Sequence, residues 1–217
     1  MTLEIDLFWS FRSPYSYLGT ARIVELARDY DLAVKVRPVF PIAIRTPDFF
    51  ERVNPLWTRY LMRDTYRVAE QLGIDYAWPV PDPVLMDPKT RRFPPEQPHI
   101  HRLTFLGIEA ALQGKGLPFI DAVSRLIWNG KTQNWHQGDH LQRAAAAAGL
   151  DLAAMDAAIT ADRAKYEAAV TANQAALEEA GHWGVPTLVF KGEPFFGQDR
   201  IETCLWRLRQ KGLRRRA

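Results

Sequence analysis

Cysteine is nearly absent from this chain of 217 residues, in which Cys204 stands alone. One cysteine excludes an internal disulfide and a cysteine-rich metal site. It fits a reducing compartment, and the N-terminus lacks the basic flank and apolar run of a signal peptide. The longest apolar runs fall well short of the ~18 residues of a membrane span. We therefore expect a cytoplasmic protein with no membrane partner.

An excess of either charge is also lacking, because 28 Lys and Arg residues against 25 Asp and Glu residues give a net charge of +3. Much of this excess lies in residues 213–217 at the C-terminus. No stripe of basic residues alternates with aromatic residues, so we expect no nucleic-acid partner. We interpret residues 213–217 as a solvated, frayed end.

Metal-binding motifs are lacking as well, although the spacing of four histidines is suggestive. His99 is two residues before His101, and His136 is four residues before His140. The second pair lacks the glutamate of a His-Glu-x-x-His motif, and no third ligand is evident. We predict no metal site.

The motif Ser13-Pro14-Tyr15-Ser16 lies between an alternating, largely apolar stretch at residues 3–9 and a stretch with helical periodicity at residues 17–27. These patterns predict a strand, a tight link and a helix. Serine is a favoured helix cap and proline a favoured first-turn residue, so Ser13 is at least a cap. In thioredoxin-like redox proteins the same place holds Cys-X-X-Cys, and both cysteine positions are serine here.

The remaining chain predicts a mixed fold. Alternating residues 31–39 indicate a second strand, parallel to the first because one helix separates them. We expect a loop at 41–55 and a long irregular segment at 78–98, where prolines are dense. The further predicted elements are helices at 56–72, 103–112, 118–128, 140–148, 151–159 and 162–180, strands at 187–190 and 193–196, and a closing helix at 201–210.

This order predicts an α/β protein of thioredoxin-like βαβ…ββα type with a large all-α insertion. We assign residues 1–45 and 182–217 to the thioredoxin-like domain and residues 46–181 to the inserted helical domain. In such a skeleton a cis-proline precedes the third strand, where Gly184-Val185-Pro186-Thr187 stands. X-Pro bonds are cis in only roughly 5% of cases, so this motif alone is weak evidence for a cis-proline. It becomes stronger together with the serine motif, because the fold brings these two positions together.

Both motifs, together with Gly197-Gln198-Asp199-Arg200, resemble the signatures of the 2-hydroxychromene-2-carboxylate isomerases and of the related kappa-class glutathione transferases. These families belong to the DsbA-like branch of the thioredoxin superfamily and carry a helical insertion. The resemblance extends over nearly the whole chain. It implies glutathione as the cofactor and a homodimer as the assembly.

The resemblance also implies roles for single residues. Ser13 would stabilise the glutathione thiolate, helped by the positive end of the helix dipole. The implied glutathione-binding residues are Asn54, Val185, Pro186, Gln198 and Asp199, although a plain helix cap explains Asp199 equally well. The family often has a lysine after the asparagine, and here the comparable stretch offers only Arg59.

The implied reaction is a reversible cis–trans isomerisation of a small aromatic or conjugated keto acid. The thiolate adds to a conjugated carbon, the former double bond rotates, and elimination restores the thiol. We expect a substrate pocket lined by residues such as Phe11, Tyr15 and the Phe49-Phe50 pair, with Arg12 as a candidate for the substrate carboxylate. Two alternatives remain open: a kappa-like glutathione transferase or peroxidase, and a thioredoxin-fold binding protein without catalysis.

Overall fold

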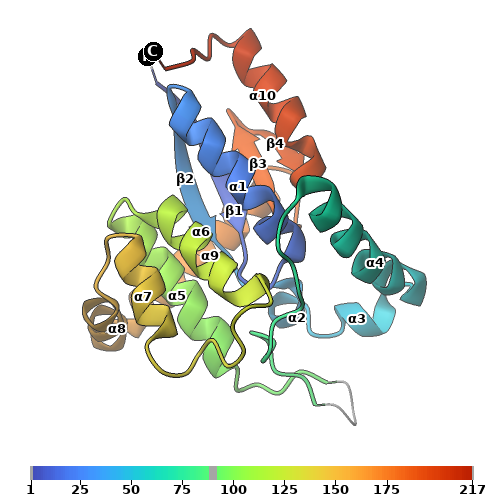
Figure 1. Cartoon of the computed structure of the whole chain (residues 1–217), viewed down its shortest axis with the longest axis vertical. Coiled ribbons are helices and arrows are strands. Elements are labelled where there is room, and N and C mark those ends of the chain that lie inside the picture. Colours follow the sequence, from blue (N-terminus) through green and yellow to red (C-terminus); the bar gives the residue numbers. More distant parts are fainter. Residues whose placement is uncertain (1, 88–91, 217) are drawn as a thin grey trace.

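The computed structural model describes residues 2–87 and 92–216, which form a four-stranded sheet with helices around it. The strand order is β2-β1-β3-β4, and the predicted βαβ…ββα arrangement is confirmed (Figure 1). β1 pairs in parallel with β2 and antiparallel with β3, which pairs antiparallel with β4. The elements of this skeleton are β1 (Leu3–Trp9), α1 (Pro14–Asp29), β2 (Leu32–Pro38), β3 (Thr187–Phe190), β4 (Glu193–Phe196), the short 3-10 helix η1 (Gln198–Arg200) and α10 (Ile201–Gln210).

The two faces of β1 pack against different layers. Leu3, Ile5, Leu7 and Trp9 belong to the largest hydrophobic cluster, together with residues of α1 and α10. Successive side chains of a strand point to opposite faces. Phe8 accordingly lies in a separate small cluster that includes a residue of α9. The central strand that leads to Ser13 is therefore covered on both faces at this end.

The chain between β2 and β3 is helical, as expected, but begins with two helices that the sequence did not predict. Both are four-residue turns between closely spaced prolines, in the stretch 41–55 that we expected to be a loop, and they are too short to show helical periodicity. The helices are α2 (Ile42–Arg45), α3 (Phe49–Arg52), α4 (Pro55–Leu72), α5 (Pro98–Leu112), α6 (Gly116–Trp128), α7 (His140–Ala147), α8 (Leu152–Ala161) and α9 (Arg163–Glu179).

One hydrophobic cluster joins the sheet to these helices. Trp9 packs edge-to-face on Phe11, with 4.7 Å between the ring centroids, and Phe11 packs on Phe119 of α6 at 6.2 Å. Trp128, also on α6, is fully buried in the same cluster. The division into domains 1–45 plus 182–217 and 46–181 stays a prediction, and any such boundary crosses a shared core.

The proline-rich segment is irregular, as predicted: between α4 and α5, the described residues 73–87 and 92–97 contain no helix or strand. Gln97, which is 3% exposed, holds this segment together. Its amide donates to the carbonyls of Leu85 (2.8 Å) and Pro94 (3.0 Å) and accepts from the Leu85 N–H (2.8 Å). The predicted stretch 78–98 includes residues 88–91, which lie outside the described residues.

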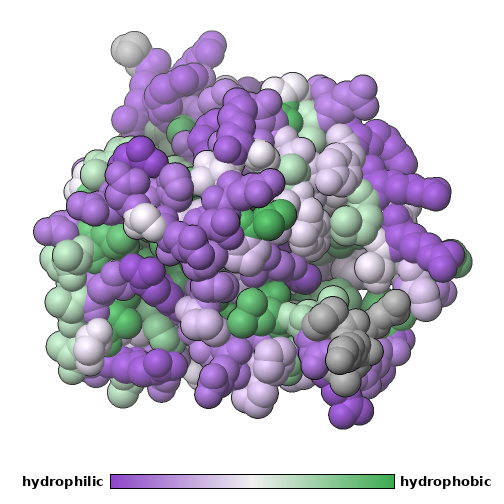
Figure 2. Space-filling model, turned by 60° about the horizontal axis from the view of Figure 1, so that its bottom comes forward, coloured by the Kyte–Doolittle hydropathy of each residue, from purple (hydrophilic) through white to green (hydrophobic). Residues whose placement is uncertain are grey.

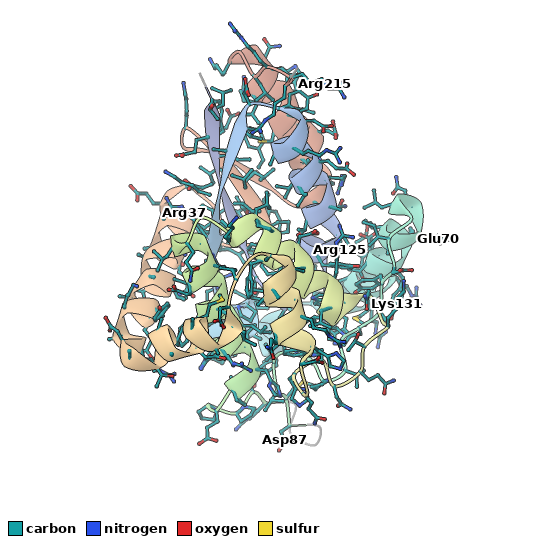
Figure 3. The ribbon with its side chains drawn as sticks, turned by 60° about the vertical axis from the view of Figure 1, so that its left-hand side comes forward. Arg37, Glu70, Asp87, Arg125, Lys131 and Arg215 are labelled. Carbon is teal, nitrogen blue, oxygen red and sulfur yellow. The ribbon has the colours of Figure 1, made fainter. Side chains whose placement is uncertain are left out.

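The C-terminal tail is ordered, so our interpretation of residues 213–217 as a frayed end was wrong for the described part of the tail. The Arg214 carbonyl accepts from the Asp31 N–H (2.9 Å), and the Arg216 N–H donates to the Asp29 carbonyl (2.8 Å). Arg215 lies beside the end of α1 in a β-bridge to Tyr30 (Figure 3). These backbone hydrogen bonds hold the basic tail, and the carboxylates of Asp29 and Asp31 lie opposite it, 4.0 Å from Arg215 and 3.9 Å from Arg216.

β4 is an edge strand with a proline in its middle. Leu188 pairs with Phe195, and Val189 pairs with Pro194. Proline is tolerated in sheets mainly on edge strands, because it has no N–H to donate. Its place in β4 is consistent with the position of β4 at the end of the sheet.

No single helix in the described parts of the chain has both the length and the apolar character of a membrane span. The helices α7 and α8 meet these criteria only when taken together, and they are bent by 99° relative to one another.

Three partly buried histidines predict a pH-dependent stability. Burial lowers the pKa of His99, His101 and His182 below the ordinary value of about 6.5. The folded protein therefore binds protons at these rings less readily than the unfolded chain does. Their contribution to stability is fully present above about pH 6.5 and is lost as the pH falls through and below that value.

We expect the Tm, followed by circular dichroism, to fall between about pH 7.5 and about pH 5. A variant with all three histidines replaced by glutamine should show a flatter dependence over the same range. A Tm of the original protein that is constant across this range would contradict the prediction.

Candidate functional site

Ser13 and Val185 meet at the start of α1, although 172 residues separate them in sequence. Ser13 is the N-cap of α1, and its Oγ accepts a hydrogen bond from the Ser16 N–H (3.2 Å). The same hydroxyl donates to the Val185 carbonyl (3.2 Å). The Val185–Pro186 peptide bond is cis, as the sequence predicts. The structure thus brings together the serine motif and the proline motif.

The turn around Pro186 is fixed by its neighbours. The Pro186 carbonyl accepts from the Gly197 N–H (2.8 Å), and the Thr187 hydroxyl donates to the Gly184 carbonyl (2.7 Å). A Cβ atom at position 184 would lie 2.4 Å from the ring of Phe196, so only glycine allows this close approach of the turn to β4.

A pocket of about 280 Å³ opens beside Ser13, between the first turn of α1, the middle of α4 and the end of β4. Across this pocket the Tyr15 hydroxyl donates to the Asp64 carboxylate (2.7 Å). Burial and this hydrogen bond raise the pKa of Tyr15, so the phenol remains a donor at physiological pH. The lining residues are Tyr15, Asp64, Phe196, Gly197, Gln198 and Asp199.

Arg22 of α1 holds the turn that carries Gln198. Its guanidinium donates to the Gln198 carbonyl (2.9 Å) and to the side-chain oxygen of the same residue. Burial lowers the pKa of Arg22. A Cβ on Gly19 would lie 3.3 Å from the Gln198 Cβ, so a small residue in α1 lets this turn come close. Asp199 is exposed and pairs with Arg200 (3.1 Å).

Asn54 lies outside this pocket. It is exposed at the N-terminus of α4, where its side-chain oxygen accepts from the Leu56 N–H (2.9 Å). The structure therefore gives Asn54 a capping role and brings only Ser13, Val185, Pro186, Gln198 and Asp199 together around the start of α1. Arg59 follows on α4 and is exposed.

Two residues that we expected at a substrate pocket have other roles. Phe11 is 1% exposed and packs in the core, so it does not line a pocket. Arg12 pairs with Asp82 (3.1 Å) and is therefore not free to bind a substrate carboxylate. The sequence pattern could not reveal either fact, because both depend on residues distant in sequence.

Aromatic rings form a connected group that reaches Phe196 at the pocket, whereas Phe49 and Phe50 themselves are half-buried and do not line it. The Phe49 centroid lies 5.6 Å from Trp183 and 5.7 Å from Trp57, and His182 stacks on Phe196 at 3.9 Å. Trp183 and Phe196 are 48% and 44% exposed. Figure 2 shows the adjoining end of the molecule, where hydrophobic side chains form small groups among hydrophilic ones.

Sequence reasoning missed Asp64, Arg22 and Asp82. Asp64 had a detectable signal, because it lies three residues after Leu61 and four before Val68, on the same face of α4 as these two apolar residues. Arg22 and Asp82 had none, since their roles arise from contacts with residues 176 and 70 positions away.

The site has no sulfur of its own. Cys204 is 1% exposed on α10, and burial raises the pKa of its thiol to about 12. Within residues 2–87 and 92–216, no group of three or more potential ligands could hold a metal ion. The described residues around Ser13 therefore contain no pair of thiols and no group of metal ligands.

A second and larger cavity lies away from these residues. It measures about 690 Å³ between α1, α6 and α7 and contains none of the predicted site residues. Its lining combines apolar residues such as Leu117 and Leu126 with Arg125, which pairs with Asp121 (2.9 Å). The smaller pocket is the better candidate, because Tyr15, Gln198 and Asp199 line it and the N–H of its lining residue Gly197 donates to the Pro186 carbonyl.

Comparison with known proteins identifies the fold of the chain. A family profile described as the DSBA-like thioredoxin domain matches residues 4–209. No curated protein sequence matches the chain. A solved 2-hydroxychromene-2-carboxylate isomerase is 20% identical, and the alignment covers 96% of this chain and 97% of that one with a TM-score of 0.70.

Two structures of the cytosolic disulfide reductase DsbM from Pseudomonas aeruginosa are also similar. One is 15% identical, with a TM-score of 0.60, and the alignment covers 96% of this chain and 100% of that one. The other is of DsbM with GSH and is 13% identical, with the same coverage and TM-score. At these identities the similarities show a common fold.

Proposed function

The chain belongs to the DsbA-like thioredoxin family, and we propose that it acts as a glutathione-dependent isomerase of 2-hydroxychromene-2-carboxylate type. One observation carries this proposal: the Ser13 hydroxyl lies at the start of α1, 3.2 Å from the carbonyl that precedes the cis-proline. The family's redox site is thus retained in shape but holds serine in place of both cysteines. Thiol chemistry at this site would need a thiol from outside the chain.

The residues present fit glutathione. The N–H groups at the start of α1 favour an anionic sulfur. The Ser13 hydroxyl donates its one proton to the Val185 carbonyl. A small rotation of this hydroxyl would direct the proton to that sulfur. The Val185 backbone would pair with the cysteinyl part in the manner of an added strand. Gln198 and Asp199 would hold the γ-glutamyl end in the pocket of about 280 Å³.

Bound glutathione would supply a thiolate that adds reversibly to a conjugated carbon, which allows cis–trans isomerisation without net redox change. Ser13 would donate its hydroxyl proton to this sulfur, and the backbone of the turn at Val185 and Pro186 would orient it. Tyr15 stays protonated and holds Asp64 beside the pocket. The exposed rings of Trp183 and Phe196 offer flat surfaces to an aromatic substrate.

The proposed setting follows from the cofactor. Glutathione is abundant in reducing compartments, so we propose a cytoplasmic protein that acts on a small conjugated keto acid. We also propose that the protein is a homodimer, because the families that this chain resembles imply such an assembly. Analytical ultracentrifugation would test the assembly.

Calorimetric titration with glutathione, followed by an assay on a chromene carboxylate, tests the proposed function. We expect binding and isomerase activity. Parallel assays on a chlorinated aromatic acceptor would detect the transferase alternative, which uses the same thiolate. If glutathione gives no calorimetric binding signal and does not raise the Tm, the proposal is overturned and a non-catalytic binding protein is favoured.

A further inference from the structure

Arg12, the residue directly before Ser13, is held by a carboxylate from the proline-rich segment. Its Nε lies 3.2 and 3.3 Å from the two oxygens of Asp82, and its Nη2 lies 3.1 Å from Oδ2. The Arg12 and Asp82 side chains are only 17% and 25% exposed. Such a bidentate, partly buried pair is stronger and more rigid than a surface ion pair.

Aromatic rings enclose the Arg12 guanidinium. Its central carbon lies 5.4 Å from the ring centroid of Trp78 and 5.8 Å from that of Phe50. The Trp78 indole also donates to Asp82 Oδ2 (3.1 Å), and the Val84 N–H donates to Oδ1 (2.9 Å). Asp82 thus accepts from three different residues, which fixes the orientation of its carboxylate.

The sequence neighbours of Asp82 are anchored to the chain that follows α6, and the neighbour of Arg12 is anchored to the last residue of α6. The Trp135 indole donates to the Pro81 carbonyl (2.8 Å), and the Asn134 N–H donates to the Val80 carbonyl (2.8 Å). On the other side, the Trp128 indole donates to the Phe11 carbonyl (3.0 Å). The chain just before Ser13 is therefore held both by its backbone and by the Arg12 side chain.

We propose that Asp82 is a positioning residue for Ser13: through Arg12 it fixes the start of α1, and it balances a positive charge that would otherwise act on a thiolate at Ser13. This inference rests on the proposed function. It assigns residues 78–84, at the start of the proline-rich segment, a direct role in tuning the site.

The charge balance has a distinctive consequence. Without the Asp82 charge, the unbalanced Arg12 favours a nearby anion, so a bound thiol ionises at lower pH. Without the Arg12 charge, the unbalanced Asp82 disfavours the anion, so the thiol ionises at higher pH. A purely structural role for the pair would not move the ionisation in opposite directions.

Other titratable and charged groups lie around the neighbouring pocket and come from several elements. They stay unchanged in the variants below, so they shift all titrations equally. These groups are Tyr15 of α1, Asp64 of α4 with its partner Arg67, Asp199 and Arg200 of η1, Arg22 behind Gln198, and His182 stacked on Phe196.

The test compares Asp82→Asn, Arg12→Met and the double variant with the original protein. The ultraviolet absorbance of the bound glutathione thiolate is titrated with pH, and glutathione binding is measured by calorimetry. We expect the thiolate titration to move to lower pH in Asp82→Asn and to higher pH in Arg12→Met, and to return close to the original in the double variant. Isomerase kcat should fall roughly tenfold in each single variant, because Ser13 is less well placed.

Asp156→Asn is the matched control, because it breaks a bidentate pair with Arg102 (2.6 and 3.0 Å) between α5 and α8. It should leave the thiolate titration and kcat unchanged. If the original protein binds no glutathione, the proposed function and this inference both fall. If it binds glutathione but the single variants do not shift in opposite directions, only the inference falls. Should Asp82→Asn not fold, the direction of the Arg12→Met shift decides.

Discussion

Replacement of Ser13 with alanine is expected to reduce isomerase turnover by about 10²- to 10³-fold, the typical loss when one donor to a reacting anion is removed. The Ser13 hydroxyl is the side-chain donor that the structure places at the start of α1, beside the cis-proline turn. The fold should survive, since the cap hydrogen bond to the Ser16 N–H is worth only about 1 kcal/mol. Steady-state kinetics with urea denaturation of the same preparation measures both effects.

Ser16→Ala is the matched control for Ser13→Ala. The Ser16 hydroxyl is fully buried and has no hydrogen-bond partner in the described structure. Its removal should therefore leave turnover within a few-fold of the original, and it relieves an unsatisfied polar group. Unchanged turnover in Ser13→Ala would reduce Ser13 to a helix cap, and an equal loss in both variants would point to packing rather than to thiolate stabilisation.

Replacement of Trp128 with alanine should lower the free energy of unfolding by about 3–5 kcal/mol. Trp128 is fully buried, and its ring packs against Tyr17, Tyr76 and Trp78 with centroids 5.3 to 6.4 Å away. Its loss also leaves the Phe11 carbonyl without its indole donor. An unpaired buried carbonyl adds to the cost of the cavity.

Trp206→Ala makes the same chemical change at a site that is 52% exposed on α10. There the main contact is the guanidinium of Arg207, 4.8 Å from the ring centroid, so the loss should be about 1 kcal/mol or less. Trp128→Phe should fall between these extremes, because it keeps an aromatic ring but not the donor. Equal midpoints for the two alanine variants in urea would contradict the central role of Trp128.

Much of the fold could be predicted because proline, glycine and alternation mark its boundaries. The strands at 187–190 and 193–196 and the helix at 201–210 have the predicted bounds. Pro186 indicated a site only in combination with the serine motif at the start of a helix. The structure places Ser13 in contact with the residue before this proline. Local patterns of this kind are set by backbone conformation, which neighbouring residues determine.

The rest could not be predicted, because it depends on contacts between distant parts of the chain. Phe11 seemed suited to an aromatic pocket, but its neighbours Trp9 and Phe119 bury it. Arg12 looked free, yet Asp82 lies opposite it. The packing of helices and loops determines which residues contact Phe11 and Arg12. The spacing of residues in the sequence does not predict these contacts.

The proline in β4 has a consequence for self-association. Pairs in an antiparallel ladder alternate between hydrogen-bonded and non-hydrogen-bonded positions, and the Gly197 N–H already bonds to the Pro186 carbonyl. Counting along the ladder puts Pro194 at a non-hydrogen-bonded position, where an N–H would face outward. The outer edge of β4 therefore lacks a donor at its middle and is a poor template for a strand of another molecule. Growth of aggregates by strand addition at β4 is disfavoured, and so is a dimer that pairs two β4 edges.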